Sequence, residues 1–487
     1  MRLKNINWWY VVGILAVFII VFLLAVNLRT DNGTILFVGS ESYVHLNNVL
    51  SSQPQQQITF YELILKSALS IFTLQKLFFI TNILFASLIF LLFTFLSISF
   101  SKSELEVYLS LIIFTLTTPL LFLFLGFFQK TFIALLGLLA LEFFSLSEGS
   151  GKFRKKHKKL VFNYYWFVLS LLVIAIIFFI NSFVGIFAIF FFVLHKLVNR
   201  SLKEFSISLF SFVLLLGLVQ WLRFQFGFFH SPIFSSFHSL MLNSLFSFFG
   251  SLTGYTLFIF ILGIGGAIIT NRVVLSTSKF FLLAVLILSL FNEYFLIFGL
   301  LIMVFYSGIA FNNILEKKWI IEYLRQLTII LLICILLFSL ITNFKILSSQ
   351  EPTSSQVSAL QKISVYDVGE SDNCTILTTS SDDVFVKYFT GLDTPSNNLF
   401  NTSKYSSFFD IQNFDEVRRV FKEGNICYVH FDDSKKTIFE RNRPPEGLDF
   451  IIRYMSEDFT KIYDSNGQRI YHYDKKNDFV ELETSLN

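Results

Sequence analysis

Residues 8–28 read WWYVVGILAVFIIVFLLAVNL and contain no charged side chain. About 20 such residues in a helix span the hydrocarbon core of a bilayer, which is about 30 Å thick. Arg2 and Lys4 precede this run, as in a signal peptide, but the run is longer than a typical signal core and no small-residue cleavage site follows it. We therefore predict that these residues form an uncleaved first transmembrane helix.

Similar apolar runs recur along the first two thirds of the chain. Of the 487 residues, 54% are hydrophobic, only 15% are charged and 65 are phenylalanine, which a soluble fold cannot bury. Because lipid offers no partner to free backbone polar groups, apolar runs of this length are expected to be helices. We predict about eleven spans, near residues 8–28, 77–99, 105–124, 129–147, 161–180, 182–198, 205–222, 254–271, 279–294, 295–312 and 327–344.

Positive charge gathers in alternate loops between these runs. The densest basic run covers residues 152–159, and further basic loops lie near Arg200, Arg272 and Lys317, whereas the intervening loops carry little positive charge. Basic loops stay on the cytoplasmic side of a membrane. The pattern predicts a multi-pass protein of the cell membrane with a cytoplasmic N-terminus, and an odd number of spans places the C-terminus outside the cytoplasm.

The composition changes after the last apolar run. Residues 1–344 are predicted to form a transmembrane domain, residues 345–358 are rich in Ser, Gln and Pro and indicate a linker, and residues 359–487 indicate a small α/β domain outside the cytoplasm. The fold class is therefore an α-helical polytopic membrane protein with a C-terminal α/β domain.

Local patterns within residues 359–487 predict individual elements. Residues 375–379 and 426–431 are typical of buried strands, residues 414–423 of an amphipathic helix, and Asn466-Gly467 of a tight hairpin turn. Cys374 and Cys427 lie on or beside the predicted strands and could pair in an oxidising compartment. No cysteine and histidine spacing typical of a zinc site is present.

The first outer loop, residues 29–76, is much longer than a connection between two spans requires. Its residues 39–50 read GSESYVHLNNVL, and Ser40 or Ser42 could cap a helix there. Helical periodicity places Tyr43, Leu46 and Leu50 on one apolar face, with His45 and Asn48 pointing elsewhere. We predict a helix lying along the membrane surface here and a second one within residues 58–73, which include Tyr61 and Glu62.

This loop resembles that of the GT-C class of membrane glycosyltransferases, as a divergent, oligosaccharyltransferase-like member. Many members of that class carry an acid followed by Tyr, His and Leu, as in DSYYHLR, just after the first span. Those places are taken here by Glu41, Tyr43, His45 and Leu46, with Asn47 where Arg is common. Thr118-Pro119-Leu120 at the outer end of the third span, and the small outer domain after the last span, also fit the class.

The resemblance implies a glycosyltransferase that moves a sugar from a polyprenyl-phosphate carrier to a protein or glycan acceptor outside the cytoplasm. The small net charge of +4 does not indicate a nucleic-acid partner. The acceptor hydroxyl then needs a general base, for which Glu41 is the first candidate and Asp31 the second. The leaving phosphate needs a cation, for which Arg223 and Lys130 are the candidates. Further candidates for contacting the substrate are Tyr43, His45, His230, His238 and Glu293.

Simpler interpretations of the same residues stay open. Glu41 could be a solvated loop acid, Arg223 a snorkelling anchor at the interface, and His45 a structural residue. The turn after the third span contains Gln129 and Lys130 but no second acid, and the WWDYG sequence of oligosaccharyltransferases is absent. A catalytically inactive membrane scaffold whose outer domain binds a partner is therefore the alternative. A transporter or flippase ranks third, because no internal repeat is visible. A requirement for a divalent metal is left open.

Overall fold

The computed structural model describes most of the chain. The described residues are 6–31, 34–50, 59–147, 164–199, 210, 211, 213, 217, 246–247, 255–270, 283–289, 293–317, 322–348, 350–366, 374–378, 383–394, 414–432 and 458–473.

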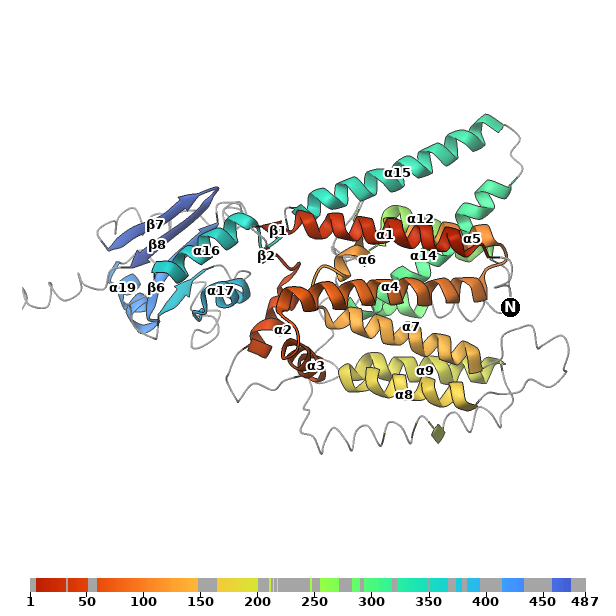
Figure 1. Cartoon of the computed structure of the whole chain (residues 1–487), viewed down its shortest axis with the longest axis horizontal. Helices are drawn as coiled ribbons and strands as arrows, with labels where there is room; N and C mark the ends of the chain where they lie inside the picture. Colours follow the sequence, from red (N-terminus) through yellow and green to blue (C-terminus); the bar gives the residue numbers. More distant parts are fainter. Residues whose placement is uncertain are drawn as a thin grey trace, which may run out of the picture. The chain divides into compact units, whose positions relative to one another are not determined.

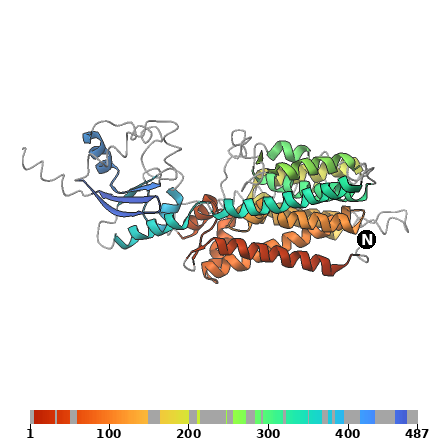
Figure 2. The ribbon, with the colours of Figure 1, turned by 90° about the horizontal axis from the view of Figure 1, so that it is seen from above.

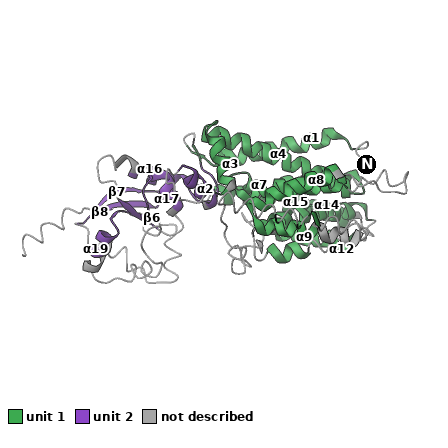
Figure 3. Cartoon of the chain, turned by 90° about the horizontal axis from the view of Figure 1, so that it is seen from below, with its two compact units in different colours: residues 1–35, 52–349 green, residues 36–51, 350–487 purple. Residues whose placement is uncertain are grey.

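The chain divides into two compact units, coloured green and purple in Figure 3. Unit 1 comprises residues 1–35 and 52–349, and unit 2 comprises residues 36–51 and 350–487. The middle of the first outer loop therefore belongs by its contacts to the same unit as the C-terminal third of the chain, although residues 52–349 lie between them in sequence.

Unit 1 is built from long apolar helices. Five helices among the described residues are long and apolar enough to cross a membrane: α1 (Trp8–Leu28), α4 (Leu74–Phe100), α7 (Gln129–Ser147), α14 (Glu293–Glu316) and α15 (Glu322–Ser348). Three others are apolar over shorter lengths: α8 (Tyr164–Ile180), α9 (Ser182–Asn199) and α12 (Leu257–Ile269). Figures 1 and 2 show α1, α4, α7, α8 and α9 running side by side along one direction.

The predicted spans agree with these helices to different degrees. The expected spans 8–28 and 129–147 coincide with α1 and α7. The expected span 205–222 lies largely outside the described residues, and so does part of the span 279–294. The number of eleven spans accordingly stays a prediction.

The third expected span, 105–124, was wrong as a single helix. The structure has α5 (Glu104–Leu116), an extended residue Thr117 with φ −84° and ψ 114°, and then a short helix α6 (Thr118–Leu123). Pro119 lies in the first turn of α6, where its missing N–H costs nothing, whereas within a continuous helix it would remove a hydrogen bond and clash with the preceding turn.

Aromatic side chains fill the core between the first helices of unit 1. Phe18 of α1 is 1% exposed, and its ring centroid lies 5.8 Å from that of Phe90 on α4 and 5.6 Å from that of Phe114 on α5. Phe124, just after α6, completes the group at 5.9 Å from Phe18. The abundance of phenylalanine is thus partly explained by interlocking rings between helices, which supply packing where lipid gives no hydrophobic driving force.

The first outer loop contains two short strands and two helices. Strands β1 (Thr30–Asp31) and β2 (Thr34–Ile35) pair antiparallel directly after α1. Helix α2 (Ser40–Leu50) and helix α3 (Phe60–Leu69) follow, close to the two predicted helices. Gly39, with φ +78°, adopts the left-handed conformation just before α2 and turns the chain into that helix.

Unit 2 contains a four-stranded mixed sheet with the order β5-β6-β8-β7. Strands β5 (Thr375–Leu377) and β6 (Ile426–Asp432) are parallel, while β8 (Gln468–Tyr473) is antiparallel to both β6 and β7 (Phe459–Ser465). The helices of this unit besides α2 are α16 (Ser354–Tyr366), α17 (Asp383–Thr390) and α19 (Phe414–Glu423).

Several local predictions for this unit are confirmed. Helix α19 has the predicted bounds, and the hairpin turns at Asn466 and Gly467, whose φ values of +51° and +76° suit a tight hairpin turn. Cys374 and Cys427 form a disulfide that joins β5 to β6. Helices also occupy both ends of the expected linker 345–358, because α15 continues to Ser348 and α16 begins at Ser354.

Candidate functional site

Glu41 and His45 lie one turn apart on α2, the helix that carries the resemblance to glycosyltransferases. The Oε1 atom of Glu41 is 3.8 Å from Nε2 of His45, so the two form an ion pair when the imidazole is protonated. The Glu41 side chain is 26% exposed and that of His45 only 9%. His45, which the periodicity placed off the Tyr43 face, is thus buried as well, so α2 is covered on more than one side.

The buried face of α2 also differs from the predicted one. Tyr43 and Leu46 are fully buried, but the next buried apolar residue is Val49, while Leu50 is 61% exposed. The Tyr43 ring lies among aromatic side chains of unit 2: its centroid is 5.1 Å from that of Phe385, 5.0 Å from Tyr388 and 5.6 Å from Phe389. Burial raises the pKa of the Tyr388 phenol, which therefore stays neutral.

A hydrogen bond fixes α2 further along. The amide Nδ2 of Asn47 donates to the carbonyl oxygen of Val384, on α17, at 3.1 Å. Sequence reasoning noted Asn47 only as a departure from the common Arg. No local pattern could have revealed this role, because the acceptor lies 337 residues further along the chain.

Asp31, the second candidate base, lies in unit 1 on the short β1–β2 hairpin. It is half-buried, pairs in register with Thr34, and accepts the Thr34 hydroxyl through its backbone oxygen at 2.7 Å. Arg29, two residues earlier, is 3% exposed, and its guanidinium donates to the carbonyl oxygen of Leu347 in the last turn of α15 at 3.5 Å. From the sequence, Arg29 was predicted only as the first residue of the outer loop.

Lys130, a candidate for the leaving phosphate, lies in the first turn of α7 in unit 1. It is 8% exposed, and its Nζ atom is 5.0 Å from the centroid of the Phe128 ring, which is a cation–π geometry. Beside it, Gln129 donates to the carbonyl oxygen of Ile180 at 3.2 Å and accepts the hydroxyl of Tyr294 at 3.3 Å. The Lys130 ammonium group is therefore a buried cation beside the Gln129 amide, an arrangement that could bind an anionic group of a substrate.

Glu62, the other acid of the first outer loop, has a structural role. Its carboxylate accepts the backbone N–H of Thr59 at 2.8 Å, and the Thr59 hydroxyl accepts the Glu62 N–H at 3.2 Å. This reciprocal pair is a capping box at the start of α3, and Glu62 is 1% exposed.

The remaining sequence-predicted candidates are outside what the structure describes. Arg223, His230 and His238 lie outside the described residues, and Glu293 begins α14 but its side chain is not described. Within the described part of the chain, no group of three or more His, Cys, Asp or Glu side chains could hold a metal ion.

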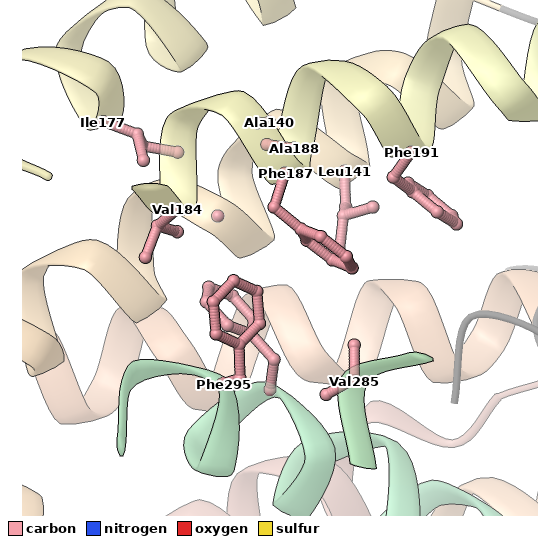
Figure 4. A pocket seen from close by; sticks show the side chains of 11 residues that line it. Ala140, Leu141, Ile177, Val184, Phe187, Ala188, Phe191, Val285 and Phe295 are labelled. Atoms are coloured by element: carbon pink, nitrogen blue, oxygen red, sulfur yellow. The ribbon is translucent and has the colours of Figure 1, made fainter. Parts of the chain in front are cut away.

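Unit 1 also holds a cavity between α7, α8, α9, residues 283–289 and α14 (Figure 4). All its lining residues are apolar: Gly137, Ala140, Leu141, Ile177, Val184, Phe187, Ala188, Phe191, Val285, Phe295 and Phe298. The rings of Phe187 and Phe295 meet edge to face with centroids 4.8 Å apart. The cavity therefore offers space for an apolar group but no group for chemistry.

The fold of the chain is similar to that of solved GT-C membrane glycosyltransferases, as the resemblance predicted. Solved structures of that class match nearly the whole chain, at identities that show the fold alone. The archaeal oligosaccharyltransferase AglB from Archaeoglobus fulgidus, in complex with an inhibitory peptide and a dolichol-phosphate, matches with a TM-score of 0.59 and 14% identity over 97% of this chain and 75% of that chain.

Two further solved structures are also similar to this chain. ArnT from Cupriavidus metallidurans, bound to undecaprenyl phosphate, matches with a TM-score of 0.58 and 10% identity over 95% of this chain and 98% of that chain. The arabinofuranosyltransferase AftD from Mycobacteria matches with a TM-score of 0.52 and 15% identity over 94% of this chain and 40% of that chain. No protein-family model and no curated protein sequence matches this chain.

Proposed function

We propose that this chain is a membrane glycosyltransferase that moves a sugar from a polyprenyl-phosphate carrier to an acceptor hydroxyl or amide outside the cytoplasm. The observation that carries the proposal is Glu41, an acid on α2 directly after the first span of a GT-C fold, held beside His45. The fold supports the carrier class, since two of the matching structures contain a polyprenyl phosphate by their descriptions.

The proposed chemistry is a single displacement. The carboxylate of Glu41 accepts the proton of the acceptor group, which attacks the anomeric carbon of the sugar. The bond between that carbon and the phosphate oxygen breaks, and polyprenyl phosphate leaves with the bond's electron pair. A protonated His45 would pair with the Glu41 carboxylate and orient it.

Charge on the leaving phosphate requires a cation. Lys130 and Arg223 are proposed for this role. The buried position of Lys130 favours it, because a charge–charge interaction is stronger where water is excluded. Asp31 is proposed as the alternative base, and His230, His238 and Glu293 stay candidates for substrate contacts. The fully buried Tyr43 is better suited to holding α2 in place than to contacting the substrate.

The test is the substitution Glu41→Gln, which keeps the size of the side chain and removes its ability to accept the proton. In cells that produce the variant at the wild-type level, the glycan or glycolipid product should fall at least about a hundredfold, a typical contribution of general base catalysis. Glu104→Gln, at the start of α5, is a matched control that should leave the product unchanged. Wild-type product in Glu41→Gln cells would contradict the proposal and favour the scaffold alternative.

A further inference from the structure

Helix α2 is too short to be stable by itself. It has 11 residues, and isolated helices shorter than about 12–15 residues are marginal in water. Its order must therefore come from the surface on which it packs. Within unit 2, that surface is helix α17.

The segment before α2 is buried in the same unit. Leu36, Phe37 and Val38 are each at most 4% exposed, and the Phe37 ring lies 5.8 Å from that of Tyr43. The Ser42 hydroxyl donates back to the Val38 carbonyl oxygen at 3.1 Å, which ties the first turn of α2 to this buried segment. Both the start and the apolar face of α2 thus depend on unit 2.

Helix α17 is itself held by the sheet of unit 2 just after its C-terminal end. It follows β5 closely in sequence, and after its end at Gly391 (φ +76°) the carbonyl oxygen of Asp393 accepts the N–H of Ile376, in β5, at 3.1 Å. The Asp393 carboxylate also accepts Lys387 Nζ, from α17, at 2.8 Å. α17 further contacts α16, which packs on β7 and β8, so these contacts anchor α17 as the platform on which α2 packs.

We propose that α17 positions Glu41 for catalysis, with Asn47 and Tyr43 on α2 as the positioning residues that transmit its order. This inference rests on the proposed function of Glu41. The Asn47–Val384 hydrogen bond sets the axial position of α2, and the Tyr43 ring among Phe385, Tyr388 and Phe389 sets its rotation. Helix α17 then acts on the reaction through α2, without itself contacting the substrate. Misplacing a catalytic group by about 1 Å can cost about a hundredfold in rate.

Two substitutions test the proposal from opposite sides of the contact. Asn47→Ala removes the amide donor while raising intrinsic helix propensity, and Phe389→Ala removes a ring of the platform. In the full-length protein in lipid nanodiscs, amide hydrogen exchange over residues 40–50 should speed up at least about tenfold in both variants, while exchange in α4 and α7 stays unchanged. Val44→Ala, at a 39% exposed position of α2, is the matched control and should not change exchange.

Activity separates positioning from a general loss of folding. At equal protein level, the amount of glycan product should fall about ten- to a hundredfold in Asn47→Ala and Phe389→Ala. The Phe389→Leu variant, which keeps a large apolar side chain, should retain most of the wild-type product. In a Glu41→Gln background, neither substitution should reduce the residual product further, because the group being positioned is already gone.

Each outcome decides a separate point. Unchanged exchange over residues 40–50 in both variants overturns the proposal, and so does a further loss of product in the Glu41→Gln background. Faster exchange without loss of product overturns the positioning role but leaves the proposed function intact. Wild-type product from Glu41→Gln alone overturns the proposed function, and the positioning role with it.

Discussion

At the residue scale, the glycines of α12 show how closely helices approach each other in unit 1. The sequence places Gly263, Gly265 and Gly266 within one turn, and close packing is expected for such residues in membrane helices. Their surroundings in the structure differ. A Cβ on Gly266 would overlap the backbone carbonyl of Tyr306 on α14, whereas a Cβ on Gly265 would have nothing within 4 Å.

These two glycines make a matched pair of substitutions. Gly266→Ala should destabilise the protein by about 1–3 kcal/mol, because the backbone of α14 must move away. Gly265→Ala should be neutral or slightly stabilising, because Ala favours helix over Gly by up to about 1 kcal/mol. The thermal unfolding midpoints of the purified proteins in detergent measure the difference. Equal midpoints for the two variants would show that α12 and α14 are not packed this closely.

Single residues of the candidate site were predictable only where the sequence pattern is local. The acid in the outer loop and its position after the first span identify Glu41, and four-residue spacing brings His45 beside it. The role of Asn47 depends on Val384, and the burial of Tyr43 depends on α17. Neither could be predicted, because helical periodicity states which residues share a face but not what covers it.

At the element scale, the apolar runs predicted helices well and helix ends less well. α1 and α7 were predicted to the residue because polar or turn-forming residues follow them directly, whereas α14 and α15 extend beyond the expected spans into polar residues that remain helical. The break at Thr117 was missed because the run is apolar on both sides of it, and only Pro119 indicates the interruption.

The paired strands β5 and β6 carry the disulfide between Cys374 and Cys427, which closes a loop with a sequence separation of 53. Loops of this size gain about 2–4 kcal/mol from a disulfide. Cys374→Ser should therefore lower the unfolding midpoint of unit 2, which hydrogen exchange in β6 measures. Reduction of the wild-type protein should have the same effect. Cys334→Ser, which removes the exposed free thiol of α15, is the control.

Two results would contradict the disulfide prediction. One is an unchanged midpoint in Cys374→Ser. The other is alkylation of both Cys374 and Cys427 in unreduced, unfolded protein, since paired cysteines do not react. A confirmed disulfide would also favour an oxidising compartment for unit 2, because disulfides are rare in the cytosol.

At the scale of the whole molecule, the fold is retained while the sequence differs almost completely from those of the matching structures, with identities of 10–15%. This is physically reasonable for a bundle of apolar helices, because a position that faces lipid needs to be apolar but not a particular residue. The order of spans and loops along the chain is constrained more strongly than the amino acid at each position. Layout therefore predicted the class, whereas the substrate depends on side chains that the layout does not determine.

The membrane orientation of the chain can be tested at two exposed positions. Basic loops predict that Lys317, at the end of α14, faces the cytoplasm, and the span count predicts that Ser465, in the β7–β8 hairpin, lies outside. Both positions are exposed, so each can be replaced by Cys in a Cys334→Ser background. In right-side-out vesicles, a membrane-impermeant maleimide should label Ser465→Cys at once and Lys317→Cys only after permeabilisation. The opposite pattern would place α2, which belongs to the same unit as that hairpin, on the cytoplasmic side, and Glu41 could not then act on an acceptor outside the cell.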